Sequence, residues 1–205
     1  MKSKLQILTL AFIAIIGFGI SESNGQNKPK MAADAKSETV KVSYKSVKID
    51  GLDIFYREAG DKNNPTILLL HGFPTSSHMF RNLIPALADK FHLIAPDYPG
   101  FGSSSMPKVT EFSYTFENLT NIVDKFTEAV GATKYSLYVQ DYGAPIGFRL
   151  AVKHPEKVQA LIVQNGNAYE EGLSENAAPL KVYGPNRDPK LTEALRGFLK
   201  PETTK

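Results

Sequence analysis

Residues Tyr135–Arg149 read YSLYVQDYGAPIGFR, and the fold that we predict for this chain is built outward from this segment. Its first six residues, Tyr135–Gln140, are rich in aromatic and β-branched side chains and predict a buried strand. From Pro145 the pattern becomes helical. A proline near the start of a helix costs little stability, because the backbone N–H that it lacks would have no hydrogen-bond partner in the first turn. Between strand and helix, Asp141 lies at a tight turn that the small residue Gly143 allows.

Two interpretations of Asp141 follow from this stretch alone. A strand, a sharp turn and a helix with one reactive side chain at the apex form a nucleophile elbow, here with aspartate in place of the usual serine. Aspartate is also a common N-cap, where it accepts hydrogen bonds from the first turn of a helix. Only the rest of the sequence can show whether Asp141 is a nucleophile or an N-cap.

The surrounding sequence predicts alternating strands and helices. Val40–Asp50 and Leu52–Glu58 alternate polar and apolar residues, which indicates a hairpin. Continuous apolar runs predict strands covered by helices on both faces, and they are Thr66–Leu70, Phe91–Ala95 and Val158–Val163. Further helices are expected near Met79–Lys90 and over Leu191–Leu199. The fold class is therefore α/β, a mostly parallel sheet with helices on both faces and its ligand crevice at the carboxyl ends of the strands.

Two loops rich in glycine and proline follow these buried strands. The first is HGFP at His71–Pro74, and the second is PDYPGFGSS at Pro96–Ser104. Each alone is a sharp turn between a strand and a helix. Together with the turn at Asp141, they place three close-approach loops at the same edge of the sheet.

The combination of HGFP, APDYPGFGSS and VQDYGAPIGFRLAVKHPEKVQALIVQN resembles the α/β-hydrolase fold family. Within it, the chain resembles the branch with an aspartate nucleophile, the epoxide hydrolases and haloalkane dehalogenases. The similarity is dense over Lys41–Asn167 and looser beyond. It implies an incomplete, C-terminally truncated hydrolase core with the start of a helical cap.

The resemblance also implies roles for single residues. Asp141 would attack an electrophilic sp³ carbon and form a covalent alkyl–enzyme ester, because a carboxylate with an ordinary pKa of about 3.9 needs no base. The backbone N–H groups of Phe73 and Tyr142 would form the oxyanion hole for the second step. The residues that would shape the loops are His71, Gly72, Pro74 and Gly143.

Hydrolysis of that ester needs a base, which in the resembled branch is a histidine held by an acidic residue. The resemblance makes His71 an orienting residue of its turn, although a histidine there could also be read as the base. The other histidines, at 78, 92 and 154, are not expected to be the base. We therefore expect this 205-residue chain to lack the acid and the histidine of the family and to be unable to catalyse repeated turnover of a substrate.

The choice between the two chemistries depends on the groups that would stabilise a leaving group. Haloalkane dehalogenases usually have asparagine and tryptophan where this chain has Phe73 and Tyr142, and Phe73 carries no side-chain donor. Two tyrosines at the expected start of the cap, Tyr169 and Tyr183, could protonate a departing alkoxide, or could have surface or core roles. These residues favour an epoxide hydrolase; the alternatives are a haloalkane dehalogenase and a non-catalytic binding protein or inactive remnant.

The chain is expected to have four regions: a signal peptide at 1–25, a flexible linker at 26–38, a partial core at 39–166 and the beginning of a cap at 167–205. Two lysines precede the short apolar run Leu5–Ile20, and small or polar residues follow it to Gly25, as in secretory signals. An uncleaved anchor is the alternative. With no cysteine, an exported bacterial protein, periplasmic or secreted, fits better than a disulfide-linked module.

The overall composition excludes some classes of partner. The net charge of +3 is small and not clustered, so we expect no nucleic-acid surface. We expect a small-molecule substrate, an epoxide or a haloalkane, with no cofactor, no metal and no stable membrane partner after signal cleavage. No particular oligomeric state is indicated.

Overall fold

The computed structural model describes residues 40–172 and 189–197. All of them belong to one unit of the chain, Glu38–Lys205. The expected signal peptide at 1–25 and linker at 26–38 lie outside the described residues, as does much of the expected cap region. Among the described helices, none is long and apolar enough to cross a membrane.

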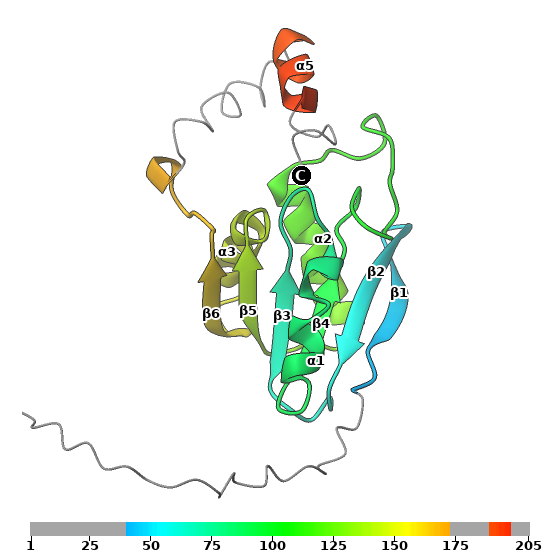
Figure 1. Ribbon diagram of the computed structural model, residues 1–205, viewed down its shortest axis with the longest axis vertical. Coiled ribbons are helices and arrows are strands. Elements are labelled where there is room, and N and C mark those ends of the chain that lie inside the picture. Colours follow the sequence, from blue (N-terminus) through cyan, green and yellow to red (C-terminus); the bar gives the residue numbers. More distant parts are fainter. Residues whose placement is uncertain (1–39, 173–188, 198–205) are drawn as a thin grey trace, which may run out of the picture. The chain divides into compact units, whose positions relative to one another are not determined.

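Six strands form one sheet in the order β1-β2-β4-β3-β5-β6 (Figure 1). The hairpin strands β1 and β2 pair antiparallel, and β2 pairs antiparallel with β4, whereas β3, β4, β5 and β6 are parallel to one another. The strands are β1 (Ser43–Ile49), β2 (Leu52–Ala59), β3 (Thr66–Leu70), β4 (His92–Pro96), β5 (Tyr135–Gln140) and β6 (Val158–Gln164). The predicted fold class, a mostly parallel sheet of an α/β protein, is confirmed.

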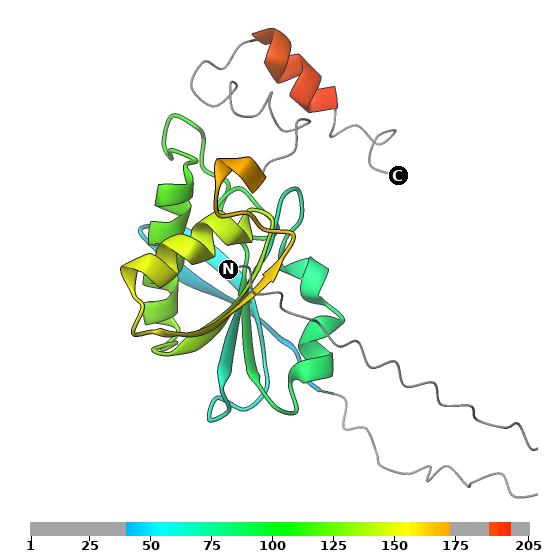
Figure 2. The ribbon, with the colours of Figure 1, turned by 90° about the vertical axis from the view of Figure 1, so that its left-hand side faces the viewer.

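Helices cover both faces of this sheet, as Figure 2 shows. The helices α2 (Phe116–Ala129) and α3 (Gly143–Lys153) cover one face, and the 3₁₀ turn η1 (Ser77–Phe80) and α1 (Leu83–Leu87) cover the other. Successive side chains of a strand point to opposite faces. Leu68 and Leu70 therefore pack in the core on the α2 and α3 side, while Leu69 packs in the core that contains Phe80.

Two helical regions differ from the prediction. The single helix expected near Met79–Lys90 is split into η1 and α1. Pro85 explains the interruption: it lies in the first turn of α1, where its ring and missing N–H prevent the helix from extending back to the carbonyl four residues earlier. The sequence prediction missed α2, although Thr115 caps its first turn by accepting a hydrogen bond from Asn118 N–H at 3.2 Å.

The prediction that Val158–Val163 is covered on both faces is wrong. The apolar side chains of β6 are about half exposed, with Leu161 at 47% and Val163 at 48%. The strand pairs with β5 alone in the described sheet. An apolar run predicts a strand, but it does not show whether a neighbour covers that strand. Beyond β6 lie the short turn η2 (Glu170–Gly172) and the helix α5 (Pro189–Gly197).

A buried ion cluster joins four strands at the amino-terminal end of β4. Glu58 of β2 is paired with Lys45 of β1, and its Oε1 lies 2.9 Å from Nε2 of His92 on β4. His92 also contacts Thr66 Oγ1 of β3 at 3.1 Å through Nδ1. Burial alone would raise the pKa of Glu58, but the hydrogen bonds from Lys45 and His92 outweigh it and lower the pKa from 4.5 to about 2.

This cluster makes the stability of the fold depend on acidity. Because the folded pKa of Glu58 lies below the unfolded one, its contribution is complete above pH 4.5 and is lost as the pH falls towards 2. The shift corresponds to at most about 3 kcal/mol. The stability of wild type towards urea should fall over this interval. Glu58→Gln should be less stable than wild type at pH 7 and should lose less stability over the same interval. Glu111→Gln, on an exposed loop, is the control that should follow the wild-type profile.

Candidate active site

Three loops meet at the carboxyl ends of the parallel strands. His71–Pro74 follows β3, the loop that begins at Asp97 follows β4, and Asp141 follows β5. Since β3 lies between β4 and β5 and runs parallel to both, these three ends share one edge of the sheet. The expected crevice position is therefore the place where the predicted site residues gather.

Asp141 lies at the apex of the turn between β5 and α3. Its backbone φ is +50°, a left-handed conformation that is uncommon outside glycine and that recurs at functional sites. Its Oδ1 accepts hydrogen bonds from the backbone N–H groups of Phe73 at 2.8 Å and of Tyr142 at 2.7 Å. The N-cap interpretation is wrong, because Tyr142 occupies the cap position and the Asp141 side chain binds the loop after β3 instead.

The turn holds this geometry because two glycines leave no space beside it. A Cβ on Gly143 would lie 2.2 Å from the carbonyl oxygen of Leu70, the last residue of β3. A Cβ on Gly72 would lie 2.5 Å from Asp141 Cβ and 2.2 Å from Gln140 Oε1. Real Cβ atoms do not approach other atoms so closely, so both positions require glycine for the loops to meet.

His71 is a buried positioning residue of this edge. Its Nδ1 donates to the Gly72 carbonyl at 3.0 Å, and its Nε2 accepts the Tyr98 N–H at 3.4 Å, which fixes the neutral tautomer. Burial lowers the pKa of His71 and outweighs the nearby carboxylates, which raise it. With both ring nitrogens engaged, His71 orients the turn, and the geometry does not support it as the base.

Asp97 is a buried carboxylate of this edge that the sequence prediction did not single out. Its Oδ1 accepts the Ser77 N–H at 2.7 Å, and its Oδ2 accepts the Ser103 N–H at 2.9 Å. These bonds tie the loop after β4 to η1. An acidic residue directly after a buried strand, in a loop with two glycines, is the signal that could have indicated this role.

Four aromatic rings contact one another beside the loops that hold Asp141, and we call them the aromatic wall: Phe73, Phe101, Phe116 and Tyr142. The Tyr142 ring stacks on the Phe73 ring at 5.4 Å between centroids and meets the Phe116 ring edge-on at 5.0 Å. Phe101 meets Phe73 at 6.3 Å. Burial and the charge of Asp141 both raise the pKa of Tyr142, so its phenol stays neutral.

The other predicted residues lie away from this edge or outside the described chain. His78 contacts Arg57 at 3.3 Å and His154 contacts Asp124 at 3.0 Å, while His92 belongs to the Glu58 cluster. Tyr169 is 77% exposed. Tyr183 lies outside the described residues. In the part of the chain that the structure describes, no three carboxylate or histidine side chains gather as a metal site would require.

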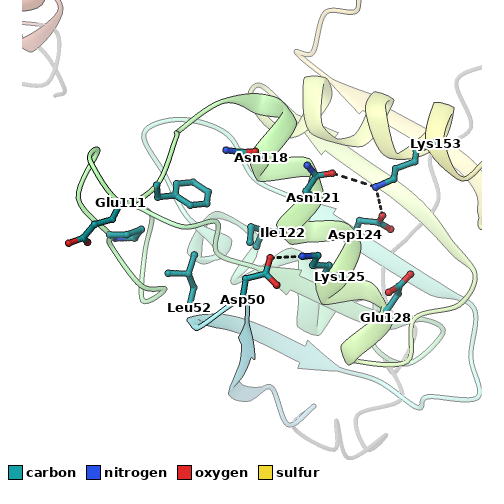
Figure 3. A pocket seen from close by; sticks show the side chains of 12 residues that line it. Asp50, Leu52, Glu111, Asn118, Asn121, Ile122, Asp124, Lys125, Glu128 and Lys153 are labelled. Carbon is teal, nitrogen blue, oxygen red and sulfur yellow. Dashed lines mark hydrogen bonds and ion pairs between the residues drawn. The ribbon is translucent and has the colours of Figure 1, made fainter.

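A cavity of about 780 Å³ lies along α2 and does not include Asp141 (Figure 3). Its lining carries four carboxylates and two lysines, and both lysines are paired with carboxylates. Lys125 is paired with Asp50 at 2.6 Å, and Lys153 is paired with Asp124 at 2.8 Å. Because these lysines are already paired, we interpret the cavity as a solvated groove. We therefore place the candidate site at Asp141.

Comparisons with known proteins show which family this chain resembles. The family model described as alpha/beta hydrolase fold matches residues 65–196. An uncharacterized hydrolase of Saccharomyces cerevisiae, YNR064C, is 48% identical over 153 residues, which are 73% of this chain and 52% of that protein. A haloalkane dehalogenase of Bradyrhizobium diazoefficiens is 37% identical over 125 residues, 61% of this chain and 39% of its own length. The chain thus spans about half the length of these relatives, or less.

Solved structures show the same likeness. The haloalkane dehalogenase DbeA of Bradyrhizobium elkani superposes with a TM-score of 0.68 at 29% identity, over 79% of this chain and 57% of that one. Epoxide hydrolase A of Mycobacterium thermoresistibile gives a TM-score of 0.55 at 34% identity, over 60% of this chain and 39% of that one. With the family model matched over more than half of its residues, the chain belongs to the α/β-hydrolase fold family, a family of enzymes.

Proposed function

We propose that Asp141 is a nucleophile that forms a covalent ester with an electrophilic carbon, and that an epoxide supplies this carbon. The observation that carries the proposal is the pair of backbone N–H groups, from Phe73 and Tyr142, that hold Asp141 Oδ1. One carboxylate oxygen thus occupies a two-donor site suited to an oxyanion. The other, Oδ2, receives no hydrogen bond from the described residues and is the oxygen that attacks.

The proposed step balances without a co-reactant. A lone pair of Asp141 Oδ2 forms a C–O bond with one epoxide carbon while the ring C–O bond at that carbon breaks. The departing oxygen leaves as an alkoxide and takes a proton from a nearby phenol or from water. No atom of the epoxide is lost, so the protein gains the mass of one intact epoxide molecule and carries a hydroxyalkyl ester.

The ester is proposed to accumulate in this chain. After attack, Oδ1 becomes the ester carbonyl oxygen and already lies on both N–H donors, each of which is worth about 100- to 1000-fold in the hydrolytic step. Hydrolysis also needs a base to activate water. Each of the four histidines of the sequence is partnered elsewhere or, like His71, has both ring nitrogens engaged.

A haloalkane dehalogenase is the second candidate, because several relatives carry that name. A departing halide needs donors beside the nucleophile. The Phe73 side chain has none, and the Tyr142 ring is held between Phe73 and Phe116. These two side chains favour the epoxide, whose oxygen can take its proton from solvent.

The two candidates differ in the mass that the protein gains. The 205-residue chain is incubated separately with 1,2-epoxyhexane and 1-bromohexane and followed by intact-protein mass spectrometry. We expect one adduct with the mass of intact epoxyhexane and little reaction with bromohexane. Bromide release together with a hexyl adduct would instead support dehalogenase chemistry, repeated formation of diol would contradict the accumulating ester, and an unmodified Asp141 with both probes would support a binding protein.

We also propose export of the chain, on the strength of the charged and apolar pattern over its first 25 residues. Fractionation of a bacterium that expresses the full sequence tests this. Recovery in the periplasm or medium, with the N-terminal residues removed, is the expected result, and recovery of the uncut chain in the cytoplasm would overturn it.

A further inference from the structure

We propose that the aromatic wall selects epoxides that carry an aryl group, and that the ring of Phe73 is its principal contact. This inference rests on the proposed function, because it names the substrate class of the same site. It follows from the arrangement of Phe73, Phe101, Phe116 and Tyr142 around the residues that hold the carboxylate.

Phe73 combines closeness to the nucleophile with an accessible ring. Its backbone nitrogen lies 2.8 Å from Asp141 Oδ1. We infer that the substituent of a substrate that reacts at this carboxylate reaches the Phe73 side chain. The residue is 43% exposed, whereas the other three members of the aromatic wall are only partly accessible. An exposed phenyl ring beside a reactive group offers a flat apolar surface to the substituent of the substrate.

The aromatic wall is also held in place before any substrate binds. The Tyr142 ring is fixed between Phe73 and Phe116 by one stacked and one edge-on contact. The Arg149 guanidinium lies over the Phe116 ring at 5.9 Å, and its Nη1 donates to the Pro145 carbonyl at 2.8 Å. A surface that is already ordered binds a flat group without a further loss of side-chain freedom.

The charges at the site favour a neutral substituent. Asp141 supplies a negative charge at the aromatic wall, and the guanidinium of Arg149 is already shared between Phe116 and the Glu117 carboxylate at 3.8 Å. A substrate with its own carboxylate would be repelled by Asp141 and would find Arg149 engaged. The selected group is therefore an uncharged aryl ring.

The test compares two epoxides that differ only in the ring. The full 205-residue chain reacts with 2-benzyloxirane or 2-(cyclohexylmethyl)oxirane, whose reacting carbons are equally remote from the ring and so have similar intrinsic reactivity. The rate of adduct formation is followed by intact mass, and the aryl probe should react about 2- to 12-fold faster, the factor that an aromatic contact adds beyond area. Phe73→Leu keeps the N–H donor but should bring the ratio close to one.

Two further variants separate loss of the ring from general damage. Phe116→Leu leaves Phe73 in place but removes the ring that contacts Tyr142 edge-on. Like Phe73→Leu, it should lower the ratio of the aryl rate to the cyclohexyl rate. Phe112→Ala, whose ring contacts Tyr114 at 4.9 Å and lies outside the aromatic wall, should leave the ratio unchanged. Adducts that form equally fast with both probes would overturn this inference and leave the proposed function standing. If neither probe forms an adduct, both this inference and the proposed function would be overturned.

Discussion

Asp141→Asn should abolish adduct formation with 1,2-epoxyhexane, with a loss on the order of 1000-fold or more, as expected when a covalent nucleophile is removed. The amide keeps the size of the side chain, and asparagine also tolerates the positive φ of +50° at this position. Its carbonyl oxygen can still accept the N–H groups of Phe73 and Tyr142. What it loses is the negative charge on the attacking oxygen.

The result is informative because the fold should survive the change. The urea midpoint of Asp141→Asn should stay close to that of wild type, and the adduct in wild type should map to the peptide that contains residue 141. Asp53→Asn removes an exposed carboxylate that pairs with Lys48, and should react like wild type. An undiminished rate in Asp141→Asn would show that another residue is alkylated, and the nucleophile assignment would then be wrong.

Strands were predictable where the physical signal is local. The bounds of β3 and β5 agree with the predicted runs Thr66–Leu70 and Tyr135–Gln140, because both strands are buried and end at glycine-rich turns. The remaining strands were found within a few residues. The mostly parallel character of the sheet also followed, since alternating strands and helices indicate parallel strands, but the order of the strands was not predicted.

Other elements depend on partners that are distant in the sequence. Whether β6 is covered depends on a neighbouring element, so its apolar run predicted burial that the structure does not show. The amphipathic helix α2 buries Leu119, Ile122 and Phe126 against the sheet, but polar residues separate these positions and make the apolar pattern weak. Its threonine cap and the 3–4 residue spacing were the available signals.

The candidate site shows the same division. The motifs predicted that the loops with Phe73, Asp97 and Asp141 share one edge, and the resemblance supplied the two N–H donors that the structure places on Asp141 Oδ1. The aromatic wall could not be predicted in this way. Its rings come from four separate segments, and only the packing of the fold brings Phe116 of α2 against Tyr142. Contacts of this kind depend on tertiary structure and leave no periodic signal.

Gly143→Ala should destabilise the fold by about 1–3 kcal/mol or more, the cost of adding a methyl group to a closely packed contact. Alanine normally stabilises a helix relative to glycine by about 0.5–1 kcal/mol, so propensity alone predicts the opposite sign. The conflict decides the outcome, because the new Cβ would lie 2.2 Å from the oxygen and 2.7 Å from the carbonyl carbon of Leu70. Leu70 is fully buried in β3, so its backbone has nowhere to move.

A graded series isolates this conflict from the general effect of glycine replacement. In Gly147→Ala, the Cβ would meet Val139 Cγ1 at 2.4 Å, a side-chain atom that can shift in part, so an intermediate loss is expected. In Gly197→Ala, the new Cβ would meet no other part of the described chain within 4 Å beyond its own helix, so we expect little loss of stability. Urea unfolding should therefore rank Gly143→Ala as the least stable of the three variants. The folded fraction of Gly143→Ala should also form the adduct more slowly than wild type, because a shift of α3 also moves Asp141. Equal stability of Gly143→Ala and wild type would mean that β3 and the elbow are not in rigid contact, and the oxyanion geometry at Asp141 would lose its structural basis.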